Sequence, residues 1–270
     1  MLPSFATLAN LLCGFSSILA SIDGRYRHAA VLIAIAVAFD IADGAVARAV
    51  GAITPFGLQF DSLADLTSFG VAPALLLYTR SLYDLHWVGW LAAGLWISCA
   101  AFRLARFNVT IDPLADKRYF IGLASPGAAG VVIATVFAFD PAWHGWQRYA
   151  PVAVAVVPAL LMASSFRFMS FRMLVAPKPD SIWLTVVTGL LLMAGLALIP
   201  AITACIVAYG YVLSCPLGWA TTPLRRRLIG PHAVAPPRYK LPSVLIPVVD
   251  EGDGQVDDDP SIDVDPLDED

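Results

Sequence analysis

Long apolar runs occupy most of the first 221 residues and limit what this chain can fold into. We expect spans at 5–22, 28–47, 62–79, 86–102, 119–139, 149–166, 182–199 and 201–221. A helix needs about 20 residues to cross a hydrocarbon core of about 30 Å. No run alternates with the period of two that a barrel strand requires. The sequence therefore predicts an all-α integral membrane protein with about eight transmembrane helices, or seven if Pro200 kinks one helix instead of separating two.

The composition supports this fold class, because 58% of the residues are hydrophobic and only 14% are charged. Soluble domains average about 25% charged residues, so this chain lacks the charge to cover a water-facing surface. The first apolar run has no basic segment before it, and we expect a retained span. The four cysteines lie in apolar stretches without metal-site spacing, so we expect them to pack as apolar residues.

Positive charge is distributed unevenly between the predicted loops. With the N-terminus in the cytoplasm, the external loops carry four Lys and Arg residues and the cytoplasmic side carries thirteen. This bias follows the positive-inside rule. We therefore expect both termini to be cytoplasmic, in a protein of the inner cell membrane.

The net charge of −4 combines a body of +7 with a tail of −11. Residues 250–270 hold eleven acidic residues and no basic one, so we expect an acidic disordered tail. It either solubilises the chain or binds a regulatory partner. We predict a transmembrane catalytic domain at 1–222 and a basic, proline-containing cytoplasmic segment at 223–249.

Four aspartates stand at helical spacing near the break between the second and third runs. Asp40 and Asp43 are three residues apart, and Asp61 and Asp65 are four apart, so each pair projects from one helix face. Helices joined by a short loop are antiparallel neighbours, so the pairs can converge. Clustered carboxylates repel one another, and bound Mg²⁺ or Mn²⁺ would remove that repulsion.

The residues between these aspartates fit a phosphate-bearing substrate. Gly44 permits close approach to the backbone, and Gly57 permits a tight turn between the helices. Arg48 lies one helical turn after Gly44, where it can face a phosphate or a base. Two metal ions about 3.5–4 Å apart could hold the attacking and leaving oxygens of an in-line displacement. A helix–helix hydrogen bond or a proton relay in an ion-coupled transporter is the alternative reading.

The full string is Asp40-x-x-Asp43-Gly44-x-x-Ala47-Arg48, eight residues, then Gly57-x-x-x-Asp61-x-x-x-Asp65. It resembles the signature of the CDP-alcohol phosphatidyltransferases. That resemblance implies a six-helix core, a CDP-linked lipid donor and two divalent ions. It also implies that the first three aspartates are metal ligands and that Asp65 is the general base and a possible further ligand. The nucleotide pocket would be lined by Gly44, Ala47, Arg48 and Gly57.

Strings outside that signature resemble the phosphatidylserine synthase branch of the family. They are Ser68-Phe-Gly-Val-Ala-Pro-Ala74, Arg103-Leu-Ala-Arg-Phe-Asn108, Phe120-Ile-Gly-Leu-Ala-Ser-Pro126 and Ser164-Ser-Phe-Arg167-Phe-Met-Ser-Phe-Arg172. The family often begins with Pro-Asn before the first span, whereas Pro3-Ser4 stands here, followed by Thr7 and Asn10. Ser4 could supply the hydroxyl for a CDP-lipid contact or cap the helix. The resemblance covers about residues 1–220.

The predicted reaction joins CDP-diacylglycerol and L-serine, and releases phosphatidylserine and CMP. Serine carries a carboxylate, so we expect a cation near the metals. For binding the acceptor, Arg106 together with Asn108 is the first choice, and Arg167 is the second. The alternatives are a sister enzyme that uses glycerol 3-phosphate or an inositol compound, and an ion-coupled transporter. We also expect contacts with membrane lipids, a homodimer and no nucleic-acid partner.

Overall fold

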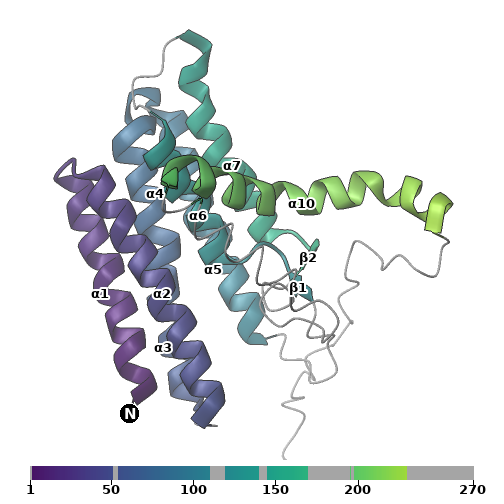
Figure 1. Cartoon of the computed structure of the whole chain (residues 1–270). Helices are drawn as coiled ribbons and strands as arrows, with labels where there is room; N and C mark the ends of the chain where they lie inside the picture. The colour runs from purple at the N-terminus through teal and green to yellow at the C-terminus, as the bar shows by residue number, and fades with distance from the viewer. Residues whose placement is uncertain are drawn as a thin grey trace, which may run out of the picture. The chain divides into compact units, whose positions relative to one another are not determined.

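The computed structural model describes residues 2–50, 54–109, 119–139, 145–169, 195 and 198–229 (Figure 1). The chain divides into one unit of residues 1–239 and a second of residues 240–270. The predicted acidic tail lies in the second unit, outside the described residues.

The first two helices form an antiparallel hairpin, α1 (Leu2–Ile22) and α2 (Tyr26–Val50), which lie side by side in Figure 1. Gly24 adopts φ +72°, a left-handed conformation that residues with a side chain rarely adopt, and it ends α1. The Ser17 hydroxyl donates to the carbonyl of Ala29, 2.9 Å away. Fully buried alanines at 29, 30 and 36 let the backbones of neighbouring helices approach closely.

The third helical segment starts at Thr54, whose side chain accepts a hydrogen bond from the Gly57 N–H at 3.0 Å. Pro55 fits the first turn, where no backbone donor is needed. The segment comprises α3 (Pro55–Asp65), the π-helical turns η1 (Leu66–Val71) and η2 (Tyr78–Leu82) on either side of α4 (Ala72–Leu77), and the 3₁₀ turn η3 (Tyr83–Leu85). Insertions of this kind often mark functional sites. η1 is the turn that follows Asp65.

The next helix, α5 (Trp87–Val109), packs against η1 and against α7. Its Trp96 is fully buried, and the indole N–H donates to the carbonyl of Phe69 in η1 at 3.1 Å. At the start of α5, a Cβ on Gly89 would lie 2.1 Å from the carbonyl oxygen of Leu82. Only a residue without a side chain allows this contact, so α5 is held tightly along the third helical segment.

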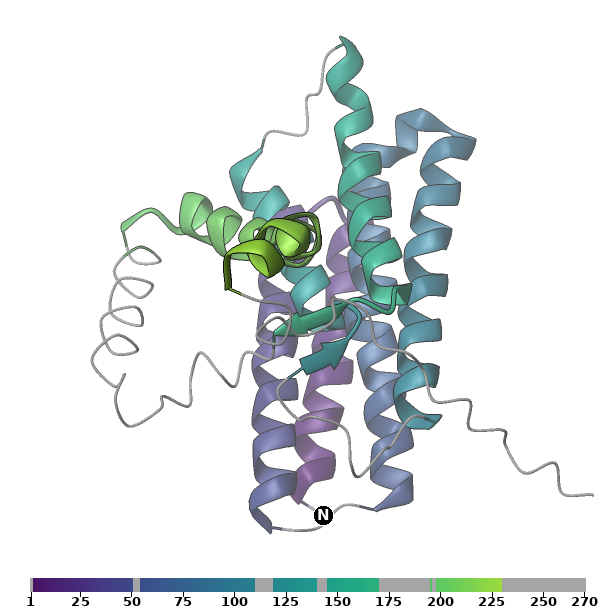
Figure 2. The ribbon, with the colours of Figure 1, turned by 90° about the vertical axis from the view of Figure 1, so that its right-hand side faces the viewer.

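The C-terminal half of the described chain contains shorter elements. They are β1 (Tyr119–Ile121), α6 (Ser125–Ala138), η4 (Gly145–Tyr149), α7 (Ala150–Ala163), β2 (Arg167–Met169) and α10 (Pro200–Ile229). The two strands pair antiparallel, with Phe120 opposite Phe168 (Figure 2). α6 packs against α2 and α10.

Within the described residues, four helical segments are long and apolar enough to cross a membrane, and they confirm an integral membrane protein of predominantly helical fold. They are Phe5–Ile22, Tyr26–Val46, Phe56–Leu85 and Trp87–Val109. Three shorter apolar helices follow at Ser125–Ala138, Gln147–Ala163 and Pro200–Ser214. The predicted span at 182–199 lies almost entirely outside the described residues. The count of eight spans therefore stays a prediction.

One element of the predicted fold was wrong. The expected span at 119–139 begins with a strand, because Gly122 at φ +80° turns the chain and Ser125–Pro126 starts α6. The two strands have only three residues each, so the described chain is helical in class, as expected. α10 begins at Pro200, directly after the non-helical Ile199. It continues to Ile229, and the domain boundary at 222 stays a prediction.

Candidate metal and acceptor site

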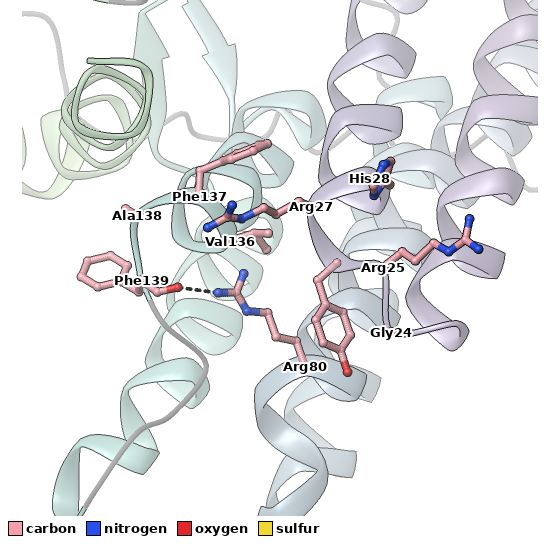
Figure 3. Close-up of a pocket in the computed structure, with 10 residues that line it drawn as sticks. Gly24, Arg25, Arg27, His28, Arg80, Val136, Phe137, Ala138 and Phe139 are labelled. Carbon is pink, nitrogen blue, oxygen red and sulfur yellow. Dashed lines mark hydrogen bonds between the residues drawn. The ribbon is translucent and has the colours of Figure 1, made fainter. Parts of the chain in front are cut away.

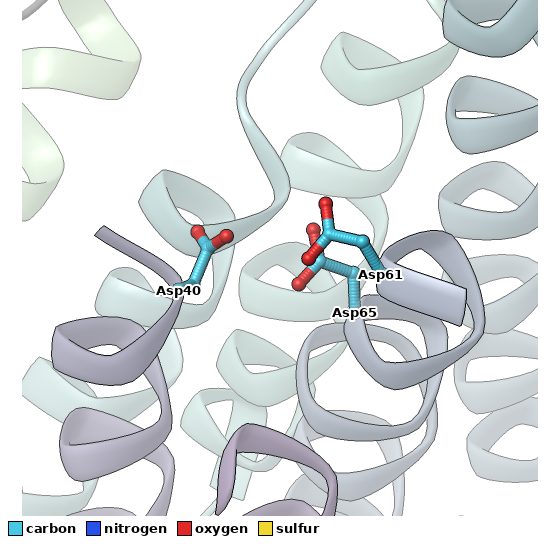
Figure 4. A group of neighbouring side chains, drawn as sticks. All are labelled: Asp40, Asp61 and Asp65. Atoms are coloured by element: carbon cyan, nitrogen blue, oxygen red, sulfur yellow. The ribbon is translucent and has the colours of Figure 1, made fainter. Parts of the chain in front are cut away.

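The aspartates of the signature come together where α2 and α3 meet. Asp40 projects from α2, and Asp61 and Asp65 project from successive turns of α3 toward it (Figure 4). One carboxylate oxygen from each of these three residues lies within 4.8 Å of the other two. The predicted convergence of the two pairs is therefore present for three of the four aspartates.

Asp43 lies beside this group and is more deeply placed. Its side chain is only 6% exposed, and its charge interacts with that of Asp61. One carboxylate oxygen accepts a hydrogen bond from the Thr7 hydroxyl of α1. The other oxygen, Oδ1, is buried without a hydrogen-bond partner among the described residues. A buried carboxylate oxygen left in this state is costly unless a cation completes it.

Asn10 is the second contribution of α1 to the site, and the sequence did not predict its role. Its side chain is fully buried, and Nδ2 donates to Oδ1 of Asp65 at 3.0 Å. Thr7 and Asn10 are three residues apart and share one face of α1, so each holds one aspartate. The available signal was this pair of polar residues at helical spacing within an otherwise apolar run.

A close contact between helices places α1 against the site. A Cβ on Gly14 would lie 2.3 Å from Oγ of Ser68 and 2.7 Å from its Cα. The Ser68 hydroxyl donates to the backbone carbonyl of Asn10 at 2.9 Å. Gly14 and Ser68 therefore fix the position of α1 relative to η1, and with it the position of the Asn10 amide beside Asp65.

The residues present fit divalent cations. Three carboxylates with oxygens within 4.8 Å of one another and a fourth beside them repel one another, and Mg²⁺ and Mn²⁺ prefer oxygen ligands. Oδ1 of Asp43 and Oδ1 of Asn10 are both buried acceptors without a donor among the described residues. Ions at this position would satisfy acceptors that the described protein groups leave unsatisfied.

Among the described side chains, Arg103 of α5 places a cation beside this cluster. Its charge interacts with those of Asp65 and Asp40, and one terminal nitrogen donates to the Ser125 hydroxyl at 2.7 Å. Its Nε is buried and has no hydrogen-bond partner among the described residues. Arg103 is thus held beside the aspartates with one donor still available. It belongs to the basic string 103–108, within which Arg106 and Asn108 had been expected to bind the acceptor.

Arg106 is one turn further along α5 and binds the end of α7. Its guanidinium donates to the carbonyls of Ala163 at 3.1 Å and of Ser164 at 3.0 Å. These are the orphan acceptors that every helix C-terminus exposes. At Gly122, which has a φ of +80°, a Cβ would lie 2.7 Å from the carbonyl oxygen of Met162 and 2.8 Å from Nη2 of Arg106, so a glycine is required there as well. The predicted role in acceptor binding stays a prediction.

Asn108 connects α5 to α3. Its Nδ2 donates to Oγ of Ser62 at 3.0 Å and to Oε1 of Gln59 at 3.4 Å. Ser62 follows Asp61 directly, so this link steadies the turn of α3 that carries Asp61. An acceptor contact by Asn108 also stays a prediction.

The predicted nucleotide-binding residues lie on the same helices as the aspartates. Gly44 follows Asp43 on α2, and Gly57 stands one turn before Asp61 on α3, where a Cβ would lie 3.0 Å from the Thr54 side chain. Four further predicted residues lie in described helices or strands, but their side chains fall outside the described part. These are Ser4, Ala47, Arg48 and Arg167.

The family model that describes CDP-alcohol phosphatidyltransferases matches residues 1–221, most of the chain. The chain belongs to the CDP-alcohol phosphatidyltransferase family. The match includes both aspartate pairs, Arg103 and α1, so the site lies wholly within the family domain. The predicted family resemblance is confirmed.

Among curated relatives, a CDP-diacylglycerol–serine O-phosphatidyltransferase of Mycobacterium leprae is 40% identical over 137 residues, covering 49% of this chain and 45% of the relative. The enzyme of the same name from Helicobacter pylori is 32% identical, covering 64% of this chain and 73% of the relative. An archaetidylserine synthase of Methanothermobacter thermautotrophicus is 38% identical, covering 62% and 69%. The match spans less than half of the M. leprae relative.

Proposed function

We propose that this CDP-alcohol phosphatidyltransferase transfers the phosphatidyl group of CDP-diacylglycerol to the hydroxyl of L-serine, releasing CMP. The observation that carries the proposal is the placement of Arg103 beside the aspartate cluster, with a buried Nε still available. The names of the three relatives, two serine phosphatidyltransferases and an archaetidylserine synthase, support serine as the acceptor.

Asp40, Asp43 and Asp61 would hold two divalent ions, Mg²⁺ or Mn²⁺, with Asp65 as a possible further ligand. Bound there, the ions would neutralise the diphosphate and the negative charge that develops on departing CMP. On α1, Thr7 and Asn10 orient Asp43 and Asp65, respectively. Partners of this kind fix the direction of a ligating carboxylate.

Asp65 is the proposed general base. It takes the proton of the serine hydroxyl, and the serine oxygen attacks the phosphorus that bears diacylglycerol. The bond from that phosphorus to the bridging oxygen breaks, and CMP leaves with the electron pair. Asp65 is 8% exposed and receives the Asn10 N–H on Oδ1, which leaves its second oxygen for the proton.

The acceptor would lie between Asp65 and Arg103, because that position joins a proton acceptor to a guanidinium. The serine carboxylate matches the planar fork of Arg103, whose orientation is set by Ser125. Arg106, Asn108 and Arg167 remain proposed acceptor-side residues. The contacts of Arg106 and Asn108 support a role in positioning α7 and α3 around the site.

Gly44, Ala47, Arg48, Gly57 and Ser4 are the proposed contacts of the CDP-lipid. The positive-inside bias supports a cytoplasmic active site, cytoplasmic termini and a location in the inner cell membrane. Eight spans and a homodimer complete the proposed organisation. Acyl chains of the donor would lie in lipid beside the helices.

The test is CMP release by the purified full-length protein in detergent with CDP-diacylglycerol and Mg²⁺ or Mn²⁺. Serine, glycerol 3-phosphate and inositol phosphate are offered separately as acceptors. We expect release with serine and little with the other two. Release with one of the others and none with serine would assign a sister activity. No release with any acceptor would contradict the proposed transferase and favour the transporter alternative.

A further inference from the structure

A second charged site lies at the opposite end of the same helices. A cavity of about 430 Å³ is lined by the start of α2, by Arg80 of η2 and by the end of α6 (Figure 3). Its described lining includes Arg25, Arg27, His28 and Arg80, and none of the ten lining residues is acidic. The cavity therefore has the chemistry of an anion site.

The cavity is separate from the aspartate cluster. Arg27 stands thirteen residues before Asp40 on α2, and Arg80 stands fifteen residues after Asp65 on the third helical segment. At a rise of about 1.5 Å per residue, both separations correspond to about 20 Å along the helix. That length is most of a hydrocarbon core, so the two sites lie toward opposite membrane faces.

Hydrogen bonds of neighbouring residues hold Arg27 and Arg80 next to each other. The Tyr26 hydroxyl donates to the carbonyl of Thr79 at 3.1 Å, which joins the first turn of α2 to η2. The Arg80 guanidinium donates to the carbonyl of Phe139 and so fixes the end of α6. Figure 3 shows the guanidinium groups of Arg27 and Arg80 directed into the same space, whereas Arg25 points away.

Two guanidinium groups in one cavity repel each other, and the position of Arg27 is not favoured by its own helix. Arg27 lies in the first turn of α2, where a positive charge opposes the helix dipole. No described carboxylate forms an ion pair with it. A phosphate group placed between two arginines would accept donors from both and remove the repulsion. The cavity therefore brings positive charges together, as the aspartate cluster brings negative charges together.

We propose that this cavity binds the phosphate of an anionic phospholipid head group. A lipid fits better than free phosphate because apolar side chains adjoin the guanidinium groups. Phe137 is 37% exposed and Phe139 is 45% exposed, and both line the cavity. A lipid offers a phosphate to Arg27 and Arg80 and a glycerol and acyl chain to the two rings. The site lies outside the proposed catalytic function.

The test compares Arg27→Gln with Arg25→Gln in the purified full-length protein. Both arginines are exposed and line the cavity, but only the guanidinium group of Arg27 is directed into it, whereas that of Arg25 points away. Binding of phosphatidylglycerol is measured by native mass spectrometry and by thermal stabilisation. Phosphatidylcholine and inorganic phosphate serve as the other two ligands.

We expect wild type and Arg25→Gln to bind phosphatidylglycerol alike, and Arg27→Gln to bind it about tenfold more weakly. Phosphatidylcholine should bind more weakly than phosphatidylglycerol in the wild type. Arg27→Lys keeps the charge and should recover part of the binding, which separates the head-group contact from a folding defect. CMP release measured without phosphatidylglycerol should be the same for wild type and Arg27→Gln, whatever the acceptor is.

Equal losses for Arg25→Gln and Arg27→Gln would overturn the proposal, because they would indicate a general surface attraction. Stabilisation by inorganic phosphate equal to that by phosphatidylglycerol would also overturn it, because the ligand would then be the free anion. Phosphatidylglycerol binding that Arg27→Gln leaves unchanged would place the lipid elsewhere on the protein.

Discussion

Replacement of Asn10 by leucine tests whether α1 takes part in the chemistry. Asn10 is fully buried and donates to Asp65 at 3.0 Å. Leucine has nearly the same size, so Asn10→Leu removes the hydrogen bond without opening a cavity. If Asn10 only fills space between helices, the enzyme should tolerate this change. If it orients Asp65, the rate should fall.

The expected loss follows from the kind of bond. A hydrogen bond to a charged group contributes about 1.5–3 kcal/mol, which corresponds to about 10- to 100-fold in rate. Removal of a partner that orients a metal-ligating group costs about the same factor in metal affinity or activity. Stability should change little, because the substitution also removes the buried Oδ1 of Asn10, which has no partner among the described residues.

The assay is CMP release from CDP-diacylglycerol and serine, measured over a range of Mg²⁺ and Mn²⁺ concentrations. Ser17→Ala provides a matched control on the same helix. Ser17 is also fully buried, and its hydroxyl donates to the carbonyl of Ala29, about 10 Å along α1 from Asn10. We expect Ser17→Ala to lose about 1 kcal/mol of stability and to keep its rate within twofold.

The reasoning is refuted if Asn10→Leu turns over within twofold of wild type at every metal concentration. It is refuted equally if Asn10→Leu and Ser17→Ala lose activity in proportion to their loss of stability. Either result would mean that α1 supports the fold and leaves the orientation of Asp65 to other groups.

Three further predictions concern the rest of the site. Asp65→Asn should reduce CMP release at least about 100-fold, because it removes the proposed general base. Binding of CDP-diacylglycerol, measured in a filter or titration assay, should be spared. A normal rate would contradict the role assigned to Asp65. Arg103→Lys keeps the positive charge but loses the planar set of guanidinium donors, so the KM for serine should rise about tenfold. The KM for CDP-diacylglycerol should change little. Equal changes in the two KM values would count against a contact between Arg103 and serine. Gly122→Ala should lower the melting temperature by about 5 °C, because φ is +80° and a Cβ would lie 2.7 Å from the carbonyl oxygen of Met162, and an unchanged melting curve would contradict this contact.

Much of the fold could be predicted because the lipid restricts the choices. Apolar runs of about 20 residues must be helical in lipid, and four of the predicted spans fall on helices long and apolar enough to cross a membrane. The start of α6 was placed too early because hydropathy does not distinguish a helix from a short apolar strand. Tyr119–Ile121 reads as part of an apolar run, but the left-handed Gly122 that follows it ends any helix.

The site was predictable where its residues lie close in sequence. Asp40 and Asp61 converge because two helices joined by a short connection are neighbours, and spacing alone sets the faces. Asn10 was missed because its contact with Asp65 spans 55 residues and depends on the approach of Gly14 to Ser68. No local pattern reports such a contact.

Arg103 and Arg106 show the same limit within one helix. Both lie in one basic string, and the sequence led us to expect Arg106 as the cation beside the aspartates. Which arginine lies beside the aspartates depends on which face of α5 packs against α3 and which face packs against α7. Arg103 faces Asp65, while Arg106 is occupied by the carbonyls that end α7. Helix packing, not composition, assigns the two arginines different tasks.

The charged residues of α2 are not where the helix dipole would favour them. A helix is stabilised by acidic residues in its first turn and basic residues in its last. α2 has Arg27 in its first turn and no acidic residue there, and its two aspartates stand in its second half. Helix stability therefore explains neither group. Each is instead paired across to a like charge on the third helical segment, Arg27 with Arg80 and Asp40 with Asp61. Such pairs are retained at a cost in stability, and a bound ion of opposite charge at each end is the simplest physical reason to retain both.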